Sequence, residues 1–294
     1  MNVLQGWVTG SFGHQLLVET AQHTQLACVM RGKQSGAACG DRVDVRPTSP
    51  GQGVIERILP RDNLLYRSVA HRSKLIAANV DQVVVVVAPL PSYHETLLNR
   101  CLVAAEAAGI PAAICINKSD LTEAVTATAR GLAGYAALGY DVLQVSAHHD
   151  VRALRERLSG RVTVLVGQSG MGKSSLINAL VPDAASATGD ISLALDSGRH
   201  TTTGARMYRI DENSRIIDSP GMQTFGLHQV SAAGLDHLFP EFRPHIGHCR
   251  FDNCRHHLEP GCAVREAAAR GEILPARLAA YLDILGELEA KRMR

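Results

Sequence analysis

The residues from Gly167 to Ser174, G-Q-S-G-M-G-K-S, follow the pattern G-x-x-x-x-G-K-[S/T] that binds phosphate groups. An apolar run precedes them and a helical stretch follows, which is the context this motif requires. The glycines let backbone N–H groups approach phosphate oxygens, while Lys173 reaches the β- and γ-phosphates and Ser174 holds Mg²⁺. A glycine-rich turn without a ligand is the alternative. The expected phosphate-binding residues are Gly167, Gln168, Ser169, Gly170, Met171, Gly172, Lys173, Ser174 and Ser175.

A second motif, Asn117-Lys118-Ser119-Asp120, follows the apolar run 112–116. The carboxylate of Asp120 can accept two hydrogen bonds from guanine, and adenine offers no such pair of donors. The stem of Lys118 can lie over the base. The alternative is a helix N-cap at Ser119 or Asp120. Beside a phosphate loop, the motif favours a guanine site, to which Asn117, Lys118 and Asp120 contribute.

The dipeptide Ser146-Ala147 follows another apolar run and is placed to offer a backbone contact to the guanine oxygen, although two residues alone carry little information.

The motif Asp218-Ser-Pro-Gly221 follows the run 215–217. Its carboxylate is suited to hold Mg²⁺ through water, and the N–H of Gly221 to sense the γ-phosphate. Met222 stands where many GTPases carry a glutamine that orients the attacking water, so hydrolysis must use another residue.

The polar stretch from Gly198 to Thr203, G-R-H-T-T-T, lies between the phosphate loop and Asp218 and is typical of a switch segment. We expect Thr202 to complete the Mg²⁺ shell, with Thr201 as the alternative register. The imidazole of His200 is suited to orient water near neutral pH, and Arg199 to stabilise charge on the transferred phosphoryl group. The alternative for His200 is a solvated loop histidine. The expected catalytic residues are therefore Lys173, His200 and Thr202.

The order of these motifs is unusual, because in ordinary GTPases the base-reading segment comes after the phosphate-binding ones. Here Asn117 to Asp120 precedes both the phosphate loop and Asp218. The sequence therefore predicts a circularly permuted GTPase.

A set of thiols and imidazoles lies near the C-terminus, with the spacing C-x4-C-x-H-x5-C. Three thiolates and one imidazole make a closed tetrahedral shell, which is typical of a structural zinc site. Other histidines lie nearby, and buried cysteines without a metal are the alternative. The expected zinc ligands are Cys249, Cys254, His256 and Cys262.

The composition is that of a soluble globular protein of 294 residues, with 46% hydrophobic and 20% charged residues. The N-terminus lacks the features of a secretory signal, and the run 83–87 is too short to span a membrane. We therefore expect a monomeric chain that acts in the cytoplasm and has no membrane partner. Seven cysteines in such a chain disfavour a disulfide framework.

Three modules are expected to position these motifs. Residues 1–68 hold short alternating runs separated by turn signals and predict a small β-barrel. Residues 69–228 alternate apolar runs with helices and predict an α/β P-loop GTPase domain. Residues 229–294 predict a zinc-binding, mainly helical module with an amphipathic stretch over 275–291.

The expected strands of the α/β domain are 80–88, 112–116, 142–145, 162–166, 207–210 and 215–217. Ser92 and Glu95 are placed to form a capping box at the start of its first helix, and Gly109 to end it.

Basic residues are in modest local excess, with nine Lys or Arg against four Asp or Glu from Arg31 to Lys74, and Arg243, Arg250 and Arg255 near the zinc ligands. A net charge of +2 is too small to indicate nucleic-acid binding by itself. An ordinary solvated surface is the alternative, but the flanking barrel and zinc module favour RNA contact.

Taken together, these motifs resemble those of the RsgA (YjeQ) family, ribosome small-subunit-dependent GTPases of bacteria with a circularly permuted domain. The resemblance covers nearly the whole chain. It implies an N-terminal OB-fold barrel, a permuted GTPase domain and a C-terminal zinc domain. It also implies GTP or GDP with Mg²⁺ at the nucleotide site, and one structural Zn²⁺. The implied role is in late maturation of the small (30S) ribosomal subunit. The chain would bind this subunit and its rRNA, and the subunit would stimulate hydrolysis. The catalytic histidine of the family corresponds to His200.

Two alternatives stay open at this point. In the first, the chain is a zinc-stabilised RNA-binding assembly chaperone in which the nucleotide only tunes affinity. In the second, it is a permuted GTPase that acts on a different RNA partner, although the zinc module after the switch segments argues against this.

Overall fold

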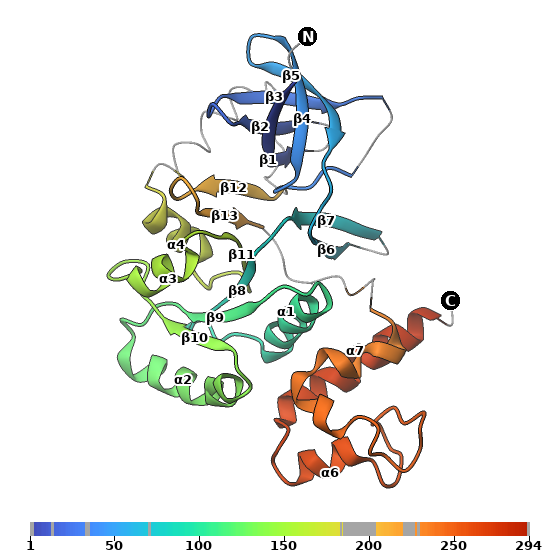
Figure 1. Cartoon of the computed structure of the whole chain (residues 1–294). Coiled ribbons are helices and arrows are strands. Elements are labelled where there is room, and N and C mark those ends of the chain that lie inside the picture. The colour runs from blue at the N-terminus through green and yellow to red at the C-terminus, as the bar shows by residue number, and fades with distance from the viewer. Residues whose placement is uncertain are drawn as a thin grey trace.

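The computed structural model describes residues 3–12, 15–32, 36–69, 72–182, 184, 204–219, 227 and 230–292. Figure 1 shows three regions in chain order, a β-barrel, a central sheet covered by helices, and a mainly helical C-terminal module. Among the described residues, no helix is long and apolar enough to cross a membrane.

The N-terminal barrel has five strands, which are β1 (Leu4–Phe12), β2 (Gln15–Thr20), β3 (Gln25–Met30), β4 (Arg42–Ser49) and β5 (Gln52–Ile58). The strands pair in the order β1-β2-β3-β5-β4, and β4 returns to pair with β1, so the barrel is closed. Alternate residues such as Val8, Val18, Val43 and Ile55 point inward and form its core. The barrel that the alternating runs predict is therefore confirmed.

The central sheet contains six strands, which are β8 (Gln82–Val87), β9 (Ala112–Ile116), β10 (Asp141–Gln144), β11 (Val162–Val166), β12 (Arg206–Arg209) and β13 (Arg215–Asp218). They lie in the order β10-β9-β8-β11-β13-β12; the neighbours from β10 to β13 are parallel, and β12 is antiparallel to β13. Each predicted strand of this domain is present to within about two residues.

Helices cover both faces of this sheet. On one face α1 (Glu95–Ala107) lies against β8 and β9, and α2 (Thr122–Ala137) lies against β9 and β10; their buried side chains share one core with Val83, Val85 and Val87 of β8. On the other face α3 (Arg152–Leu158) lies against β10 and α4 (Lys173–Leu180) lies against β13; their buried side chains share a second core with Val84 and Val86. Because successive side chains of a strand point to opposite faces, the valine run of β8 serves both cores.

The start of α1 differs from the sequence prediction. The N-cap residue is His94, and no side chain caps this helix end, so the capping box of Ser92 and Glu95 is wrong. The carboxylate of Glu95 instead accepts a hydrogen bond from the hydroxyl of Tyr135 on α2. The N–H of His94 donates to the side-chain oxygen of Gln168 in the phosphate loop. The carboxylate of Glu95 and the N–H of His94 thus form hydrogen bonds with distant residues and not with each other's neighbours in a local cap.

Two features of the strand pairing are not predicted by the sequence. The hairpin of β6 (Leu64–Val69) and β7 (Arg72–Ala78) forms a separate two-stranded sheet between the barrel and β8. In addition, β12 pairs with β1, at Gly10 and Arg206, so that the barrel and the central sheet form one sheet of eleven strands.

The C-terminal module contains three short 3₁₀ helices, η1 (Ala232–Gly234), η2 (Asp236–Leu238) and η3 (Pro240–His245), followed by α6 (Ala263–Ala269) and α7 (Pro275–Arg292). The aromatic rings of Phe239, Phe242 and Tyr281 pack together at its centre. Helix α7 lies against α1, so the module is attached to the helical layer of the GTPase domain.

Candidate nucleotide site and metal cluster

The phosphate loop begins where the buried strand β11 ends. Gly167 has φ +141°, and a Cβ there would lie 2.2 Å from the carbonyl oxygen of Val86. Gly172 has φ +85°, and a Cβ there would lie 2.3 Å from Nδ2 of Asn117. A side chain would clash at both positions, so the loop needs glycine to pass this close to β8 and to Asn117.

Lys173 is the first residue of α4, at the helix end where backbone N–H groups are free to bind anions. Its Nζ donates to the carbonyl oxygens of Gly167 at 2.6 Å and Gln168 at 2.8 Å. Burial lowers the pKa of Lys173, and the nearby carboxylate of Asp218 partly offsets this. Burial in turn raises the pKa of Asp218, against the effect of Lys173. The structure therefore brings the lysine and the aspartate of two separate motifs together.

Asn117 connects the base-reading motif to the phosphate loop. Its side chain is 1% exposed. The Nδ2 group donates to the carbonyl oxygen of Met171 at 3.0 Å, and Oδ1 accepts from the N–H of Ala147 at 3.1 Å. One amide thus joins the ends of β9, β10 and β11, which are the carboxyl ends of parallel strands where ligands bind in such sheets.

Asp120 lies beside Ser146, whose hydroxyl donates to its carboxylate at 2.7 Å. This hydrogen bond lowers the pKa of Asp120 and keeps the group ionised. Helix α2 begins at Thr122 with Leu121 as its N-cap, so neither Ser119 nor Asp120 caps it. The exposed carboxylate is therefore held at the sheet edge and is available to accept hydrogen bonds.

Lys118 has an unusual backbone conformation, with φ +62°. Its Nζ donates to the carbonyl oxygens of Leu90 at 2.6 Å and Gly170 at 3.0 Å. The side chain thereby stretches between the loop after β8 and the phosphate loop. Sequence reasoning missed Leu90, because it contributes only a backbone carbonyl and no residue pattern signals that role.

The remaining predicted residues of the nucleotide site lie outside the part of the chain that the structure describes. They are Arg199, His200, Thr201, Thr202 and Gly221. Their roles stay predictions.

The four predicted zinc ligands come together in the C-terminal module, with all candidate ligand atoms within 4.8 Å of one another. Nδ1 of His256 lies 3.6 Å from Sγ of Cys249 and 3.3 Å from Sγ of Cys262, and the two sulfurs are 4.0 Å apart. Sulfurs on a tetrahedral Zn²⁺ with bonds of about 2.3 Å are about 3.8 Å apart. The cluster, which includes Cys254, is therefore compatible with zinc.

The second ring nitrogen of His256 points to a carboxylate. Nε2 is buried without a hydrogen-bond partner and lies 3.6 Å from Oδ2 of Asp236. Metal-ligating histidines usually donate their other N–H to such an oxygen, which fixes the ring orientation. With Nδ1 of His256 facing the cysteine sulfurs, Nε2 is the nitrogen left to donate, and Asp236 is placed to accept from it. Sequence reasoning missed it, because it lies 13 residues before Cys249 and belongs to no ligand pattern.

Five arginines of the span 31–74 form ion pairs with carboxylates of the same span. Among the described residues of the span 31–74, each of the four carboxylates pairs with at least one arginine. The pairs are Arg31 and Arg46 with Glu56, Arg42 with Asp62, Arg57 with Asp44, and Arg61 with Asp41. The count of basic residues alone therefore overstates the positive charge of this surface.

The permuted order of the motifs, together with a phosphate loop that shares one sheet edge with Asn117 and Asp120, defines a circularly permuted P-loop GTPase. The family model for the RsgA GTPase matches residues 58–228. The chain belongs to the RsgA GTPase family.

Relatives and solved structures agree over nearly the full chain. The small ribosomal subunit biogenesis GTPase RsgA of Nitrosospira multiformis is 53% identical over 99% of this chain and 93% of its own length. The protein of the same name from Nitrosomonas europaea is 50% identical over 97% of this chain and 92% of its own length. The crystal structure of YjeQ from Thermotoga maritima has a TM-score of 0.76 and 32% identity, and covers 98% of this chain and 99% of its own. The crystal structure of YloQ, described as a circularly permuted GTPase, has a TM-score of 0.71 and 26% identity, and covers 99% of this chain and 96% of its own.

Proposed function

We propose that this chain binds the small ribosomal subunit and hydrolyses GTP during the biogenesis of that particle. The names of its full-length relatives support this assignment. The observation that carries the choice of GTP is the placement of Asp120, held by Ser146 on the sheet edge that also bears the phosphate loop. A carboxylate there favours guanine over adenine.

The proposed reaction is attack of water on the γ-phosphorus, with cleavage of the bond to the oxygen that bridges the β- and γ-phosphates. Lys173 neutralises the phosphate oxygens. Ser174 and Thr202 would hold Mg²⁺, with Asp218 reaching it through water, and this ion supplies positive charge where negative charge develops. His200 would orient the attacking water, because Met222 cannot replace the glutamine of many GTPases.

We also propose that Cys249, Cys254, His256 and Cys262 bind one Zn²⁺. A shell of four protein ligands leaves no open position, so its role would be to stabilise the C-terminal module. The rRNA contact is assigned to the barrel, residues 1–68, and to the zinc module, residues 229–294, on either side of the GTPase domain, residues 69–228. We also propose that the chain acts as a monomer in the cytoplasm.

The test is the rate of GTP and ATP hydrolysis with and without stoichiometric small ribosomal subunits. Stimulation of GTP hydrolysis alone is the expected result. Hydrolysis of ATP in preference to GTP would contradict the role of Asp120. Tight GTP binding without stimulation would exclude the subunit as the activating partner.

A second test uses His200→Ala, which we expect to lower the stimulated rate by about 10²-fold to 10⁴-fold with little change in GTP affinity. Release of the protein from the particle should then stall. Normal release would favour the alternative in which hydrolysis is incidental.

A further inference from the structure

The hairpin of β12 and β13 follows the predicted switch segment in the sequence and ends at a residue that the proposed function places at Mg²⁺. The switch stretch Gly198 to Thr203 precedes it in the sequence, and Asp218 is its last strand residue. The two strands are paired so that Arg206 lies opposite Asp218. A displacement at either end of the hairpin is therefore carried into β12 and β13 together.

The backbone of this hairpin joins the barrel directly. Arg206 on β12 pairs with Gly10 on β1. Just before β12, a Cβ at Gly204 would lie 2.1 Å from the carbonyl oxygen of Ser11. Such a close approach is possible only for glycine, so the start of β12 and the end of β1 are in direct backbone contact.

Two side-chain contacts extend this junction along the hairpin. The guanidinium of Arg209 lies 2.9 and 3.1 Å from the two ring nitrogens of His23, between β2 and β3. On β13, Arg215 lies over the ring of Trp7 on β1 at 5.2 Å. Arg42 of the barrel lies over the same ring at 5.8 Å. The only tryptophan of the chain therefore reports on the contact between hairpin and barrel.

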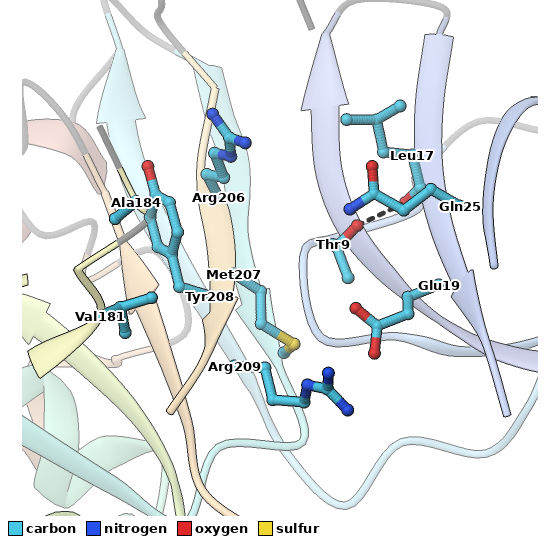
Figure 2. Close-up of a pocket in the computed structure, with 10 residues that line it drawn as sticks. All are labelled: Thr9, Leu17, Glu19, Gln25, Val181, Ala184, Arg206, Met207, Tyr208 and Arg209. Carbon is cyan, nitrogen blue, oxygen red and sulfur yellow. Dashed lines mark hydrogen bonds between the residues drawn. The ribbon is translucent and has the colours of Figure 1, made fainter. Parts of the chain in front are cut away.

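The junction also includes a pocket of about 150 Å³ between β12 and the barrel. Figure 2 shows Met207 and Arg209 pointing from β12 toward the barrel, while Tyr208 points the other way, toward Val181. The pocket leaves this part of the junction less densely packed than a core.

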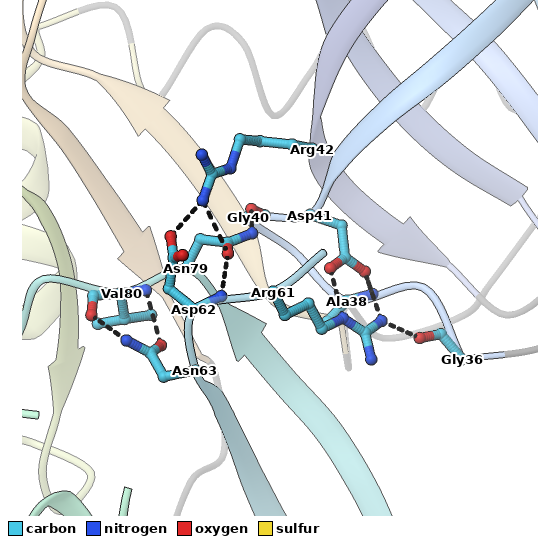
Figure 3. A network of polar contacts seen from close by, with 10 residues as sticks. All are labelled: Gly36, Ala38, Gly40, Asp41, Arg42, Arg61, Asp62, Asn63, Asn79 and Val80. Carbon is cyan, nitrogen blue, oxygen red and sulfur yellow. Dashed lines mark hydrogen bonds and ion pairs between the residues drawn. The ribbon is translucent and has the colours of Figure 1, made fainter. Parts of the chain in front are cut away.

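A second attachment holds the barrel to the part of the GTPase domain that precedes β8 (Figure 3). The buried side chain of Asn79 donates to the carbonyl oxygen of Gly40 at 2.9 Å and accepts from the N–H of Asp62. The buried carboxylate of Asp41 accepts from the guanidinium of Arg61 at 2.7 Å. We call these residues, with Asn63 and its bonds to Val80, the polar clasp.

The two attachments differ in what they connect. The polar clasp fixes the barrel to residues next to β8, which carry no predicted switch. The hairpin fixes the same barrel to β13, which ends at the proposed Mg²⁺ contact Asp218, and to β12, whose first residue lies opposite Asp218. We infer that the β12–β13 hairpin transmits the nucleotide state to the barrel, which turns about the polar clasp. This inference rests on the proposed function and adds a means by which GTP hydrolysis would alter the RNA contact of the barrel.

The first test is the quenching of Trp7 fluorescence by acrylamide in the full chain, with GDP or the β,γ-imido analogue of GTP. Calorimetry on the same samples measures the binding of both nucleotides. The expected result is a different quenching constant in the two nucleotide states. Binding of both nucleotides with unchanged quenching would overturn this inference alone. Binding of neither would overturn the proposed function and this inference with it.

The second test uses the reciprocity of coupled sites, because a contact that senses the nucleotide must also affect nucleotide affinity. Arg209→Ala and His23→Ala remove the same contact from its two sides. Each should change the ratio of analogue to GDP affinity by about twofold to fivefold, and the double variant should change it no further. Arg57→Ala is the matched control, because Arg57 is an exposed arginine whose pair with Asp44 stays within the barrel. Ratios for Arg209→Ala and His23→Ala equal to that of the wild type would contradict the inference.

Discussion

The buried ion pair of Arg277 and Glu241 gives the sharpest test of what stabilises the C-terminal module and its contact with α1. Arg277 on α7 is fully buried, and the Glu241 side chain on η3 is 2% exposed. The guanidinium donates to the carboxylate at 2.6 and 3.2 Å and to Oδ1 of Asn99 on α1 at 3.3 Å. It also lies 4.5 Å from the ring centre of Phe239. One side chain on α7 thus contacts η3, the residue that precedes η3, and α1.

Arg277→Met would leave the Glu241 carboxylate buried without its partner. Removal of one member of a buried pair costs about 3–5 kcal/mol, because the remaining charge keeps its desolvation penalty. The double variant Arg277→Met with Glu241→Met removes both charges, and we expect it to recover most of that loss. The measurement is the free energy of unfolding in urea, followed by far-ultraviolet circular dichroism.

The matched control is Arg100→Met. Arg100 on α1 also forms a two-bond pair with a carboxylate, Glu287 on α7, but the Glu287 side chain is 49% exposed. Loss of this pair should cost at most about 1 kcal/mol. If Arg277→Met cost no more than Arg100→Met, or if the double variant were as unstable as Arg277→Met alone, the reasoning from burial would be refuted.

Three further predictions concern the two sites. Asp120→Asn should weaken GDP binding by about 10²-fold or more. It should improve the binding of xanthosine diphosphate, because the amide of Asn can donate to the 2-oxo group of xanthine. Unchanged GDP affinity in a competition assay would contradict this prediction. Asp236→Asn should lower zinc affinity by about 10-fold to 100-fold in a chelator competition, and equal affinity would remove its role toward His256. Because burial lowers the pKa of Lys173, the nucleotide-free protein should lose the ammonium charge at a lower pH than an ordinary lysine would, so the rate of GDP association should fall earlier on the alkaline side. The raised pKa of Asp218 means that its carboxylate is protonated at a higher pH than usual, so Mg²⁺-dependent binding should fall earlier on the acid side. A pH profile that follows ordinary lysine and aspartate values would contradict both statements.

Much of the GTPase domain could be predicted because its strands are buried on both faces. The run 112–116 is apolar throughout and the run 162–166 is apolar except for Thr163, and the structure has both strands with these bounds. The phosphate loop was predictable for a similar reason, since glycine and lysine spacing reflects local backbone geometry. The four zinc ligands lie within 14 residues of one another, so their spacing also carries the signal.

Other features depend on contacts between distant segments and left no local pattern. The pairing of β1 with β12 joins residues nearly 200 positions apart. The capping box failed because Glu95 and the N–H of His94 bond to Tyr135 and Gln168 instead. The hairpin of β6 and β7 was hidden because its short strands resemble a connection between modules.

The strand order has a consequence for how the chain folds as it is synthesised. The barrel strands β1 to β5 lie within residues 4–58 and can close on themselves before the rest emerges. Next, β8, β9 and β10 form neighbouring strands in chain order, and β11 then adds to the free edge of β8. The hairpin of β12 and β13 arrives last and has a finished strand on either side, β11 and β1. Permutation thus lets the sheet grow outward from β8, and the final step of its assembly closes the seam between a sheet and a barrel that have already formed.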